Sequence, residues 1–308
     1  MAIIDDLFKI LVFPGFLFVV NLGLFLEWLD RKIYARLQNR VGPPWYQPWL
    51  DILKLLSKED VIPEGASRFM FTWLPVFYLA VTVTASLCIP VGTYAAIYSF
   101  PGDLIVVLFL LTLATIILFL LGWYSGSPFG RVGAVRAVTQ FLAYEVPLVA
   151  ALLTQALLAD SWSISLVMAR TTVGFPRFVV VHLTALAVAL ISLQGKLLRV
   201  PFDAPEAETE IVAGPFTEYT GRRLAFIRLA ERTEMAVGVG LVSDLFLPFP
   251  ARLGVLGFVI SAILVTFVLS VLRASVARFR IEDTTVLAWK YILPFSALGM
   301  VLAIIVRG

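Results

Sequence analysis

Five carboxylates lie within one polar segment of an otherwise strongly apolar chain. The segment, RVPFDAPEAETEIVAGPFTEYTG, covers residues 199–221, and its acids are Asp203, Glu206, Glu208, Glu210 and Glu218. Ionisable groups at membrane depth are costly, so they usually mark a pathway for ions or protons. A solvated loop that leads into a helix would also be acidic, because carboxylates stabilise a helix N-terminus. The segment is therefore either an ion-handling site or a polar connection between two apolar helices.

Further ionisable residues could extend such a site into the membrane. Glu145 lies within an apolar stretch, and Glu231 and Glu234 follow the polar segment. Glu206 and Glu210 are four residues apart, so on one helix they would share a face and raise the pKa of at least one carboxyl group. The available counter-charges are Arg199, Arg222, Arg223, Arg228 and Arg232. Acids with separated pKa values beside arginines suit a proton path; the structural alternative is that buried Glu–Arg pairs lock helices together.

The composition indicates which elements position these residues. Hydrophobic residues make up 60% and charged residues 15% of the 308 positions, whereas about 25% charged residues is usual in soluble domains. A helix needs about 20 apolar residues to cross a bilayer. Eight stretches meet this length approximately: residues 8–28, 69–91, 104–123, 135–158, 178–198, 223–247, 253–272 and 285–306. The sequence therefore predicts an all-α membrane protein, with residues 1–308 forming a single polytopic membrane domain of about eight transmembrane helices.

Four polar segments are predicted as cytoplasmic loops, at about residues 29–68, 124–136, 199–222 and 273–285. With the adjoining helix ends, that side holds 19 of the 24 Lys and Arg residues, which is a strong positive-inside bias. Both termini are then predicted to lie on the outer side of the cell membrane. In the first loop, GPPWYQP breaks any helix. The apolar face after it, which includes Trp49, Ile52 and Leu53, is typical of a short interfacial helix.

Several functions are excluded by what the chain lacks. Cys88 is the single cysteine, so neither an intrachain disulfide nor a Cys-ligated iron–sulfur centre is expected. His182, the single histidine, lies in an apolar run and is expected to pack between helices. No phosphate-binding glycine loop or nucleophile–base arrangement is present. The net charge of +3 follows membrane topology, so no nucleic-acid partner is expected.

Four stretches together resemble one family. They are residues 29–59 (LDRKIYARLQNRVGPPWYQPWLDILKLLSKE), 122–145 (GWYSGSPFGRVGAVRAVTQFLAYE), 199–221 and 275–282 (SVARFRIE). They are similar to the membrane subunit of respiratory complex I that joins the peripheral arm to the membrane arm, and to the anchor subunit of membrane-bound NiFe hydrogenases and related sulfane reductases. GSPFG, GPFTEYTG and ARFRIE look more like the hydrogenase group. Lys196 stands where the complex I pattern commonly has Glu, which puts a standard quinone pocket in doubt.

The resemblance implies a role and a set of partners. The expected fold has eight spans with a tilted first helix and a short cytoplasmic amphipathic helix. The chain would bind no cofactor or metal and would not itself be catalytic. Its cytoplasmic face would dock a peripheral iron–sulfur subunit and a NiFe-hydrogenase-like large subunit, which would carry 4Fe-4S clusters and a NiFe centre. Antiporter-like and small membrane subunits would be its neighbours in the plasma membrane, and electron transfer would be linked to H⁺ or Na⁺ translocation.

The resemblance also implies roles for individual residues. Asp203, Glu206, Glu208, Glu210 and Glu218 would be carboxylates coupled to the redox reaction. Glu145 and Glu231, with Glu234 as a further member, would continue the path into the membrane. The implied docking residues and charge partners are Arg31, Arg36, Arg40, Arg199, Arg222 and Arg228.

Two alternatives remain open from the sequence. One is the quinone-binding membrane subunit of an NADH-, ferredoxin- or deazaflavin-dependent complex I, which would bind a quinone. The other is a stand-alone secondary transporter, which predicts internal repeats and broken helices around a midplane site. Pro147 partly matches a broken helix, because a proline should kink or loosen the span at 135–158, but the sequence contains no internal repeat.

Overall fold

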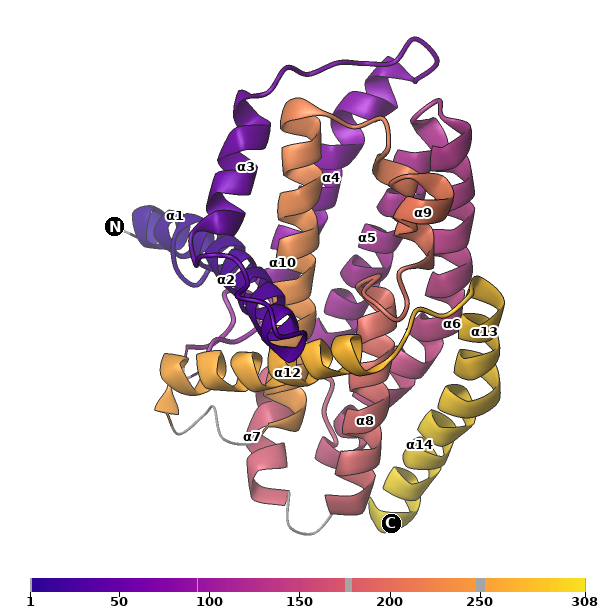
Figure 1. Cartoon of the computed structure of the whole chain (residues 1–308). Coiled ribbons are helices and arrows are strands. Elements are labelled where there is room, and N and C mark those ends of the chain that lie inside the picture. Colours follow the sequence, from indigo (N-terminus) through magenta and orange to yellow (C-terminus); the bar gives the residue numbers. More distant parts are fainter. Residues whose placement is uncertain (1, 93, 175–178, 248–252, 308) are drawn as a thin grey trace.

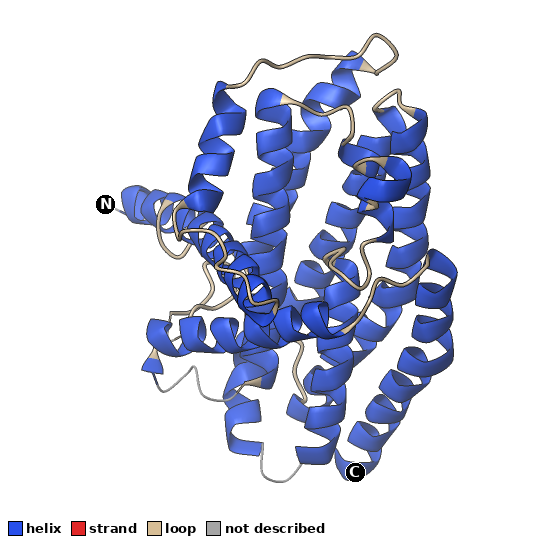
Figure 2. Cartoon of the chain, viewed as in Figure 1, coloured by secondary structure: helices blue, strands red, loops and turns tan. Residues whose placement is uncertain are grey.

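The computed structural model describes residues 2–92, 94–174, 179–247 and 253–307 (Figure 1). Its regular structure is helical throughout these residues, apart from one isolated bridge between Val91 and Tyr94 (Figure 2). The longer helices are α1 (Ala2–Leu11), α2 (Phe16–Leu37), α3 (Gln47–Ser57), α4 (Arg68–Ser86), α5 (Asp103–Tyr124), α6 (Pro128–Ala159), α7 (Ile164–Gly174), α8 (Val179–Lys196), α10 (Gly221–Phe246), α12 (Val255–Ser275) and α14 (Leu293–Arg307). The predicted all-α fold is confirmed.

The remaining elements are short. The polar segment forms η2 (Ala204–Glu206), α9 (Glu208–Ile211) and η3 (Gly214–Phe216), and α13 (Ile281–Leu287) continues through η4 (Ala288–Ile292) into α14. Within the described residues, seven helical stretches are long and apolar enough to cross a membrane: Ile4–Leu37, Arg68–Ser86, Asp103–Tyr124, Pro128–Ala159, Val179–Lys196, Val255–Ser275 and Ile281–Val306. The eighth predicted span, at 223–247, is the helix α10, whose many charges keep it out of that apolar set.

Helix α10 is the centre of the bundle. It contacts α2, α3, α4, α6, α7, α8 and α12, and every residue from Thr233 to Phe246 is buried. Helix α2 crosses α10 obliquely, whereas α4, α5 and α6 run alongside one another (Figure 1). Because protein surrounds α10, its charged side chains need not face lipid.

Several predicted boundaries were wrong, because hydropathy marks the apolar part of a helix and not its end. Helix α2 continues to Leu37 instead of ending near Trp28, and the Glu27–Arg31 pair supports its polar turns. The loop predicted at 124–136 shrinks to 125–127, because α6 begins at Pro128, a residue favoured in the first helical turn. Helix α6 also continues through Pro147 without a break, and α7 was not predicted.

Parts of three predicted polar loops, those at 29–68, 124–136 and 199–222, meet in the structure. Helix α3 begins at Gln47, within the GPPWYQP segment. At one end of the bundle the Val61 amide donates to Thr220 Oγ1 at 3.2 Å, and the backbones at Gly65 and Gly126 approach closely. The C-terminus lies at the opposite end (Figure 1). That the end carrying these loops faces the cytoplasm stays a prediction.

A glycine permits a close approach of α2 to α10. A Cβ atom on Gly23 would lie 2.2 Å from the Arg232 carbonyl oxygen and 2.6 Å from its carbonyl carbon. We expect Gly23→Ala to force the two helices apart, destabilising the protein by about 1–3 kcal/mol and lowering its thermal midpoint in detergent. Gly299→Ala is the matched control, because a Cβ there meets nothing within 4 Å. Equal midpoints for the two variants would contradict this account.

Candidate functional site

A charged cavity of about 670 Å³ opens beside the polar segment. Helices α2, α3 and α10, the end of α8 and the residues that follow α8 and α12 form most of its wall. Its lining includes six carboxyl and seven basic side chains: Glu27, Asp51, Asp203, Glu206, Glu231 and Glu234, and Arg31, Lys196, Arg199, Arg228, Arg232, Arg273 and Arg278. The two signs nearly balance, so the cavity can hold many charges without a large net field.

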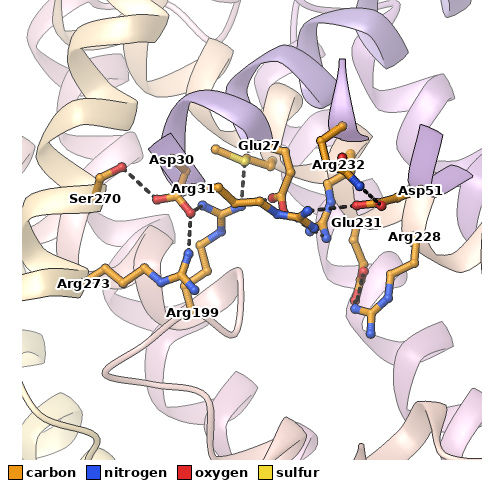
Figure 3. Close-up of polar contacts among 12 residues, drawn as sticks. Glu27, Asp30, Arg31, Asp51, Arg199, Arg228, Glu231, Arg232, Ser270 and Arg273 are labelled. Atoms are coloured by element: carbon orange, nitrogen blue, oxygen red, sulfur yellow. Dashed lines mark hydrogen bonds and ion pairs between the residues drawn. The ribbon is translucent and has the colours of Figure 1, made fainter. Parts of the chain in front are cut away.

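Glu27 on α2 gathers three arginines from three parts of the chain. Its Oε1 lies 2.6 Å from Arg31 Nε and 3.2 Å from Arg232 Nη2, and its Oε2 lies 2.9 Å from Arg199 Nη2. The side chain of Glu27 is almost fully buried. One carboxylate thereby joins α2, α10 and the start of the polar segment (Figure 3).

Asp30, one turn further along α2, extends this cluster to α12. Its carboxylate pairs with Arg199 Nη1 at 2.9 Å and with Arg273, and it accepts a hydrogen bond from Ser270 Oγ at 2.7 Å. Arg199 therefore bridges Glu27 and Asp30 (Figure 3). We call Glu27, Asp30, Arg31, Arg199, Arg232 and Arg273 the α2 cluster.

The charges of α10 face the same cavity. Arg228 Nη1 lies 2.9 Å from Glu231 Oε2, an ion pair between residues three positions apart on the helix. The same guanidinium lies 3.8 Å from Glu206 and over the ring of Phe216. One turn deeper, the Tyr78 hydroxyl donates to Glu234 Oε2 at 2.7 Å.

Glu206 and Glu210 do not share a helix face, and that prediction was wrong. The chain changes direction at Ala207, between η2 and α9. Glu206 faces the cavity, where burial and the neighbouring Glu231 raise its pKa to about 7. Glu210 instead pairs with Arg136 outside the cavity lining, and the hydrogen bond from that arginine lowers its pKa.

The other predicted acids divide between the cavity and its surroundings. Asp203 lines the cavity, 3.1 Å from Arg278 Nε. Glu218 is half-buried and is not among the lining residues. The next residue, Tyr219, stacks on Phe71. The side chain of Glu208 lies outside the described residues. Three predicted docking arginines are exposed and outside the lining: Arg36, Arg40 and Arg222.

Glu145 lies beyond the large cavity, in a smaller one that shares Lys196 with it. Its Oε2 lies 2.6 Å from Lys196 Nζ. His182 is buried and hydrogen-bonded to Gln155 and to the Phe246 carbonyl, in agreement with the predicted packing role. Sequence reasoning did not identify the α2 cluster, although the four-residue spacing of Glu27 and Arg31 was a signal for part of it.

The raised pKa of Glu206 predicts a pH-dependent stability. The folded protein binds this proton more tightly than the unfolded chain does, since the carboxyl pKa rises from 4.5 to about 7. Stability from this group is therefore present below 4.5 and is lost as pH rises through about 7. We expect Glu206→Gln to remove this loss, so that the thermal midpoint falls less between about pH 5.5 and 8 than in the wild type.

Glu210→Gln is the matched control for Glu206→Gln. The pKa of Glu210 is lowered by Arg136, so its contribution has the opposite sign and is present only at higher pH. The effect should be small, because the side chain is 52% exposed. If both variants changed the pH dependence in the same direction, the assignment of Glu206 to the cavity would be wrong.

Known proteins with similar sequences cover nearly the whole chain. The family model described as NADH dehydrogenase matches residues 8–304. The H subunit of NADH-quinone oxidoreductase from Thermomicrobium roseum is 35% identical, over 94% of this chain and 93% of that protein. Its counterpart from Carboxydothermus hydrogenoformans is 33% identical, over 89% and 81%.

A solved structure shares the fold. One chain of the membrane-bound sulfane sulfur reductase, an archaeal respiratory membrane complex, has a TM-score of 0.85 and 26% identity, covering 93% of this chain and 96% of that one. The matched residues 8–304 include every residue that lines the two cavities.

Proposed function

Because the chain belongs to the NADH dehydrogenase family and is an H-type subunit of a multisubunit membrane respiratory complex, we propose that it is the anchor and ion-coupling subunit of that complex. Peripheral subunits transfer electrons at the end of the bundle that carries the polar segment. This chain holds no redox centre. Its buried ionisable groups link the electron transfer to the translocation of H⁺ or Na⁺.

The charged cavity is the observation that carries this proposal. It begins at Asp203 and Glu206 in the polar segment and reaches Glu234 inside α10. Two unit charges 4 Å apart interact by about 4 kcal/mol at an effective dielectric constant near 20. A proton or charge that arrives near Glu206 therefore alters the electrostatic potential at Glu231 and Glu234. Such a response could pass into the membrane without any group in this chain being oxidised or reduced.

The exposed basic residues near the polar loops support docking of partner subunits. Arg36, Arg40 and Arg222 are exposed, and α3 presents Leu50 and Leu53 at its surface. We propose that an iron–sulfur subunit and a NiFe-hydrogenase-like large subunit dock on this face, with 4Fe-4S clusters and the NiFe centre in those partners. Antiporter-like and small membrane subunits would contact the apolar surface of the membrane-spanning helices. In this arrangement both termini lie on the outer side of the cell membrane.

Quinone binding is the second candidate function. The similarity to NADH-quinone oxidoreductase subunits favours it, and a volume of about 670 Å³ lies within the range of ligand pockets. Such pockets are mostly lined by hydrophobic and aromatic side chains, whereas charged side chains make up about half of this lining. The charged lining favours the ion-coupling role. The stand-alone transporter is set aside, because the chain is a subunit of a complex.

The proposal is tested on the native complex purified in mild detergent. Its nickel and iron contents are measured, together with its hydrogen evolution, polysulfide reduction and quinone reduction. These measurements distinguish a hydrogenase-type or sulfane-reductase-type complex from a quinone-reducing one. The complex is then reconstituted into vesicles, and proton and sodium movement are measured during electron transfer. Electron transfer without ion movement would overturn the coupling role. Quinone reduction without nickel would establish the second candidate.

A further inference from the structure

Lys196 and Glu145 form one of the most deeply buried ion pairs among the described residues. The lysine ammonium lies 2.6 Å from Glu145 Oε2, and the side chains of lysine and glutamate are 2% and 10% exposed. The Thr112 hydroxyl donates to the other carboxylate oxygen. The ammonium also lies 3.4 Å from Thr115 Oγ1. Helices α5, α6 and α8 thus meet at one satisfied polar centre.

The lysine lines two cavities. The large cavity contains Lys196 together with Glu234 and Tyr78, whereas the small cavity contains Lys196 together with Glu145. Glu234 is buried, with Tyr78 as a hydrogen-bond donor. The ammonium therefore belongs both to the cavity that holds the buried carboxylate of α10 and to the cavity that holds the carboxylate of α6.

Stability alone does not account for this pair. A buried ion pair often contributes no more than apolar side chains of the same volume, because both charges lose their hydration. Lysine has a flexible four-carbon stem and three donors, so its ammonium can exchange one acceptor for another at little cost in geometry. It has an acceptor of this kind in each cavity, Glu145 in the small one and Glu234 in the large one.

We propose that Lys196 is the switch between the charged cavity and Glu145, an inference that rests on the proposed ion-coupling function. In the resting state the Lys196 ammonium neutralises Glu145 and blocks proton transfer between the charged cavity and Glu145. A proton that binds to Glu145 Oε2 removes this attraction, and Lys196, which keeps its own proton, turns towards the Glu234 carboxylate. The Lys196–Glu145 pair then carries one positive charge, which Glu234 balances. Return of the ammonium to Glu145 releases the proton.

The test separates a switch from a structural lock. Lys196→Met alone leaves Glu145 buried without a counter-charge, so its main effect would be on assembly. The decisive variant is the double change Lys196→Met with Glu145→Gln, which removes both charges. We expect the double variant to assemble and transfer electrons as the wild type does. Ion movement per electron in vesicles should fall by at least about tenfold. Lys58→Met, at an exposed lysine after α3, is the control.

Lys196→Arg keeps the charge and supplies a second test. A guanidinium holds a carboxylate in a fixed two-point geometry, so a purely structural lock should work as well or better with arginine. We expect normal assembly and slower ion movement. Wild-type ion movement in either variant, or loss of assembly in both, would overturn the switch and leave the proposed function intact. Absence of ion movement in the wild type would overturn both.

Discussion

Glu231→Gln is expected to lower ion movement per electron by about tenfold or more, while electron transfer in the peripheral subunits continues. Glu231 lines the cavity together with Glu206 and the deeper Glu234. Glutamine has nearly the same shape but cannot take up or release a proton, and loss of a positioned acid–base group typically costs a factor of about 10² to 10⁴. The measurement is ion uptake by vesicles during electron transfer, divided by the electron-transfer rate.

The variant should still assemble, and this makes the result informative. Arg228 loses its closest carboxylate but retains Glu206 at 3.8 Å and the ring of Phe216. Glu64→Gln, at an exposed acid outside the cavity lining, is the matched control and should leave ion movement per electron unchanged. If Glu231→Gln moved as many ions per electron as Glu64→Gln, Glu231 would have to be removed from the proposed path.

The fold could be predicted from the sequence because each long helix carries its own apolar stretch. The charged helix α10 was recognised for the same reason, since the stretch from Met235 to Phe246 carries one charge, Asp244. Helix ends were predicted less well. Residues 29–37 include four charged side chains yet are helical, because local pairs such as Glu27–Arg31 stabilise a helix after its apolar stretch has ended.

The candidate site was predictable only where its contacts are local. The Arg228–Glu231 pair follows from a three-residue spacing. The contact of Arg199 with Glu27 joins residues 172 positions apart, and that of Arg273 with Asp30 joins residues 243 apart. No spacing rule reaches so far, so the α2 cluster was not recognised. Lys196 was noticed as a departure from a family pattern, but its partner depends on how α6 and α8 pack.

The α2 cluster and the carboxylates of α10 are expected to differ in what their loss affects. Glu27 has arginine partners from α2, α10 and the polar segment, so it fixes the wall of the cavity. Glu231 has Arg228 as its partner on the same helix. A carboxylate held by several fixed cations is poorly suited to accept a proton, because each cation favours its ionised form. We therefore expect the cluster to act as the frame of the cavity and to lie outside the proposed path.

Glu27→Gln is accordingly expected to destabilise the subunit by about 3–5 kcal/mol, the usual cost of leaving a buried charge without its partner. Three guanidinium groups would then face one another with no shared carboxylate. Assembly of the complex and its thermal midpoint are the measurements. Asp51→Asn is the control, because it breaks only the ion pair with Arg31, whose two side chains are 35% and 40% exposed, and should cost at most about 1 kcal/mol. A Glu27→Gln complex that was stable but moved no ions would place Glu27 in the path and would refute its role as the frame.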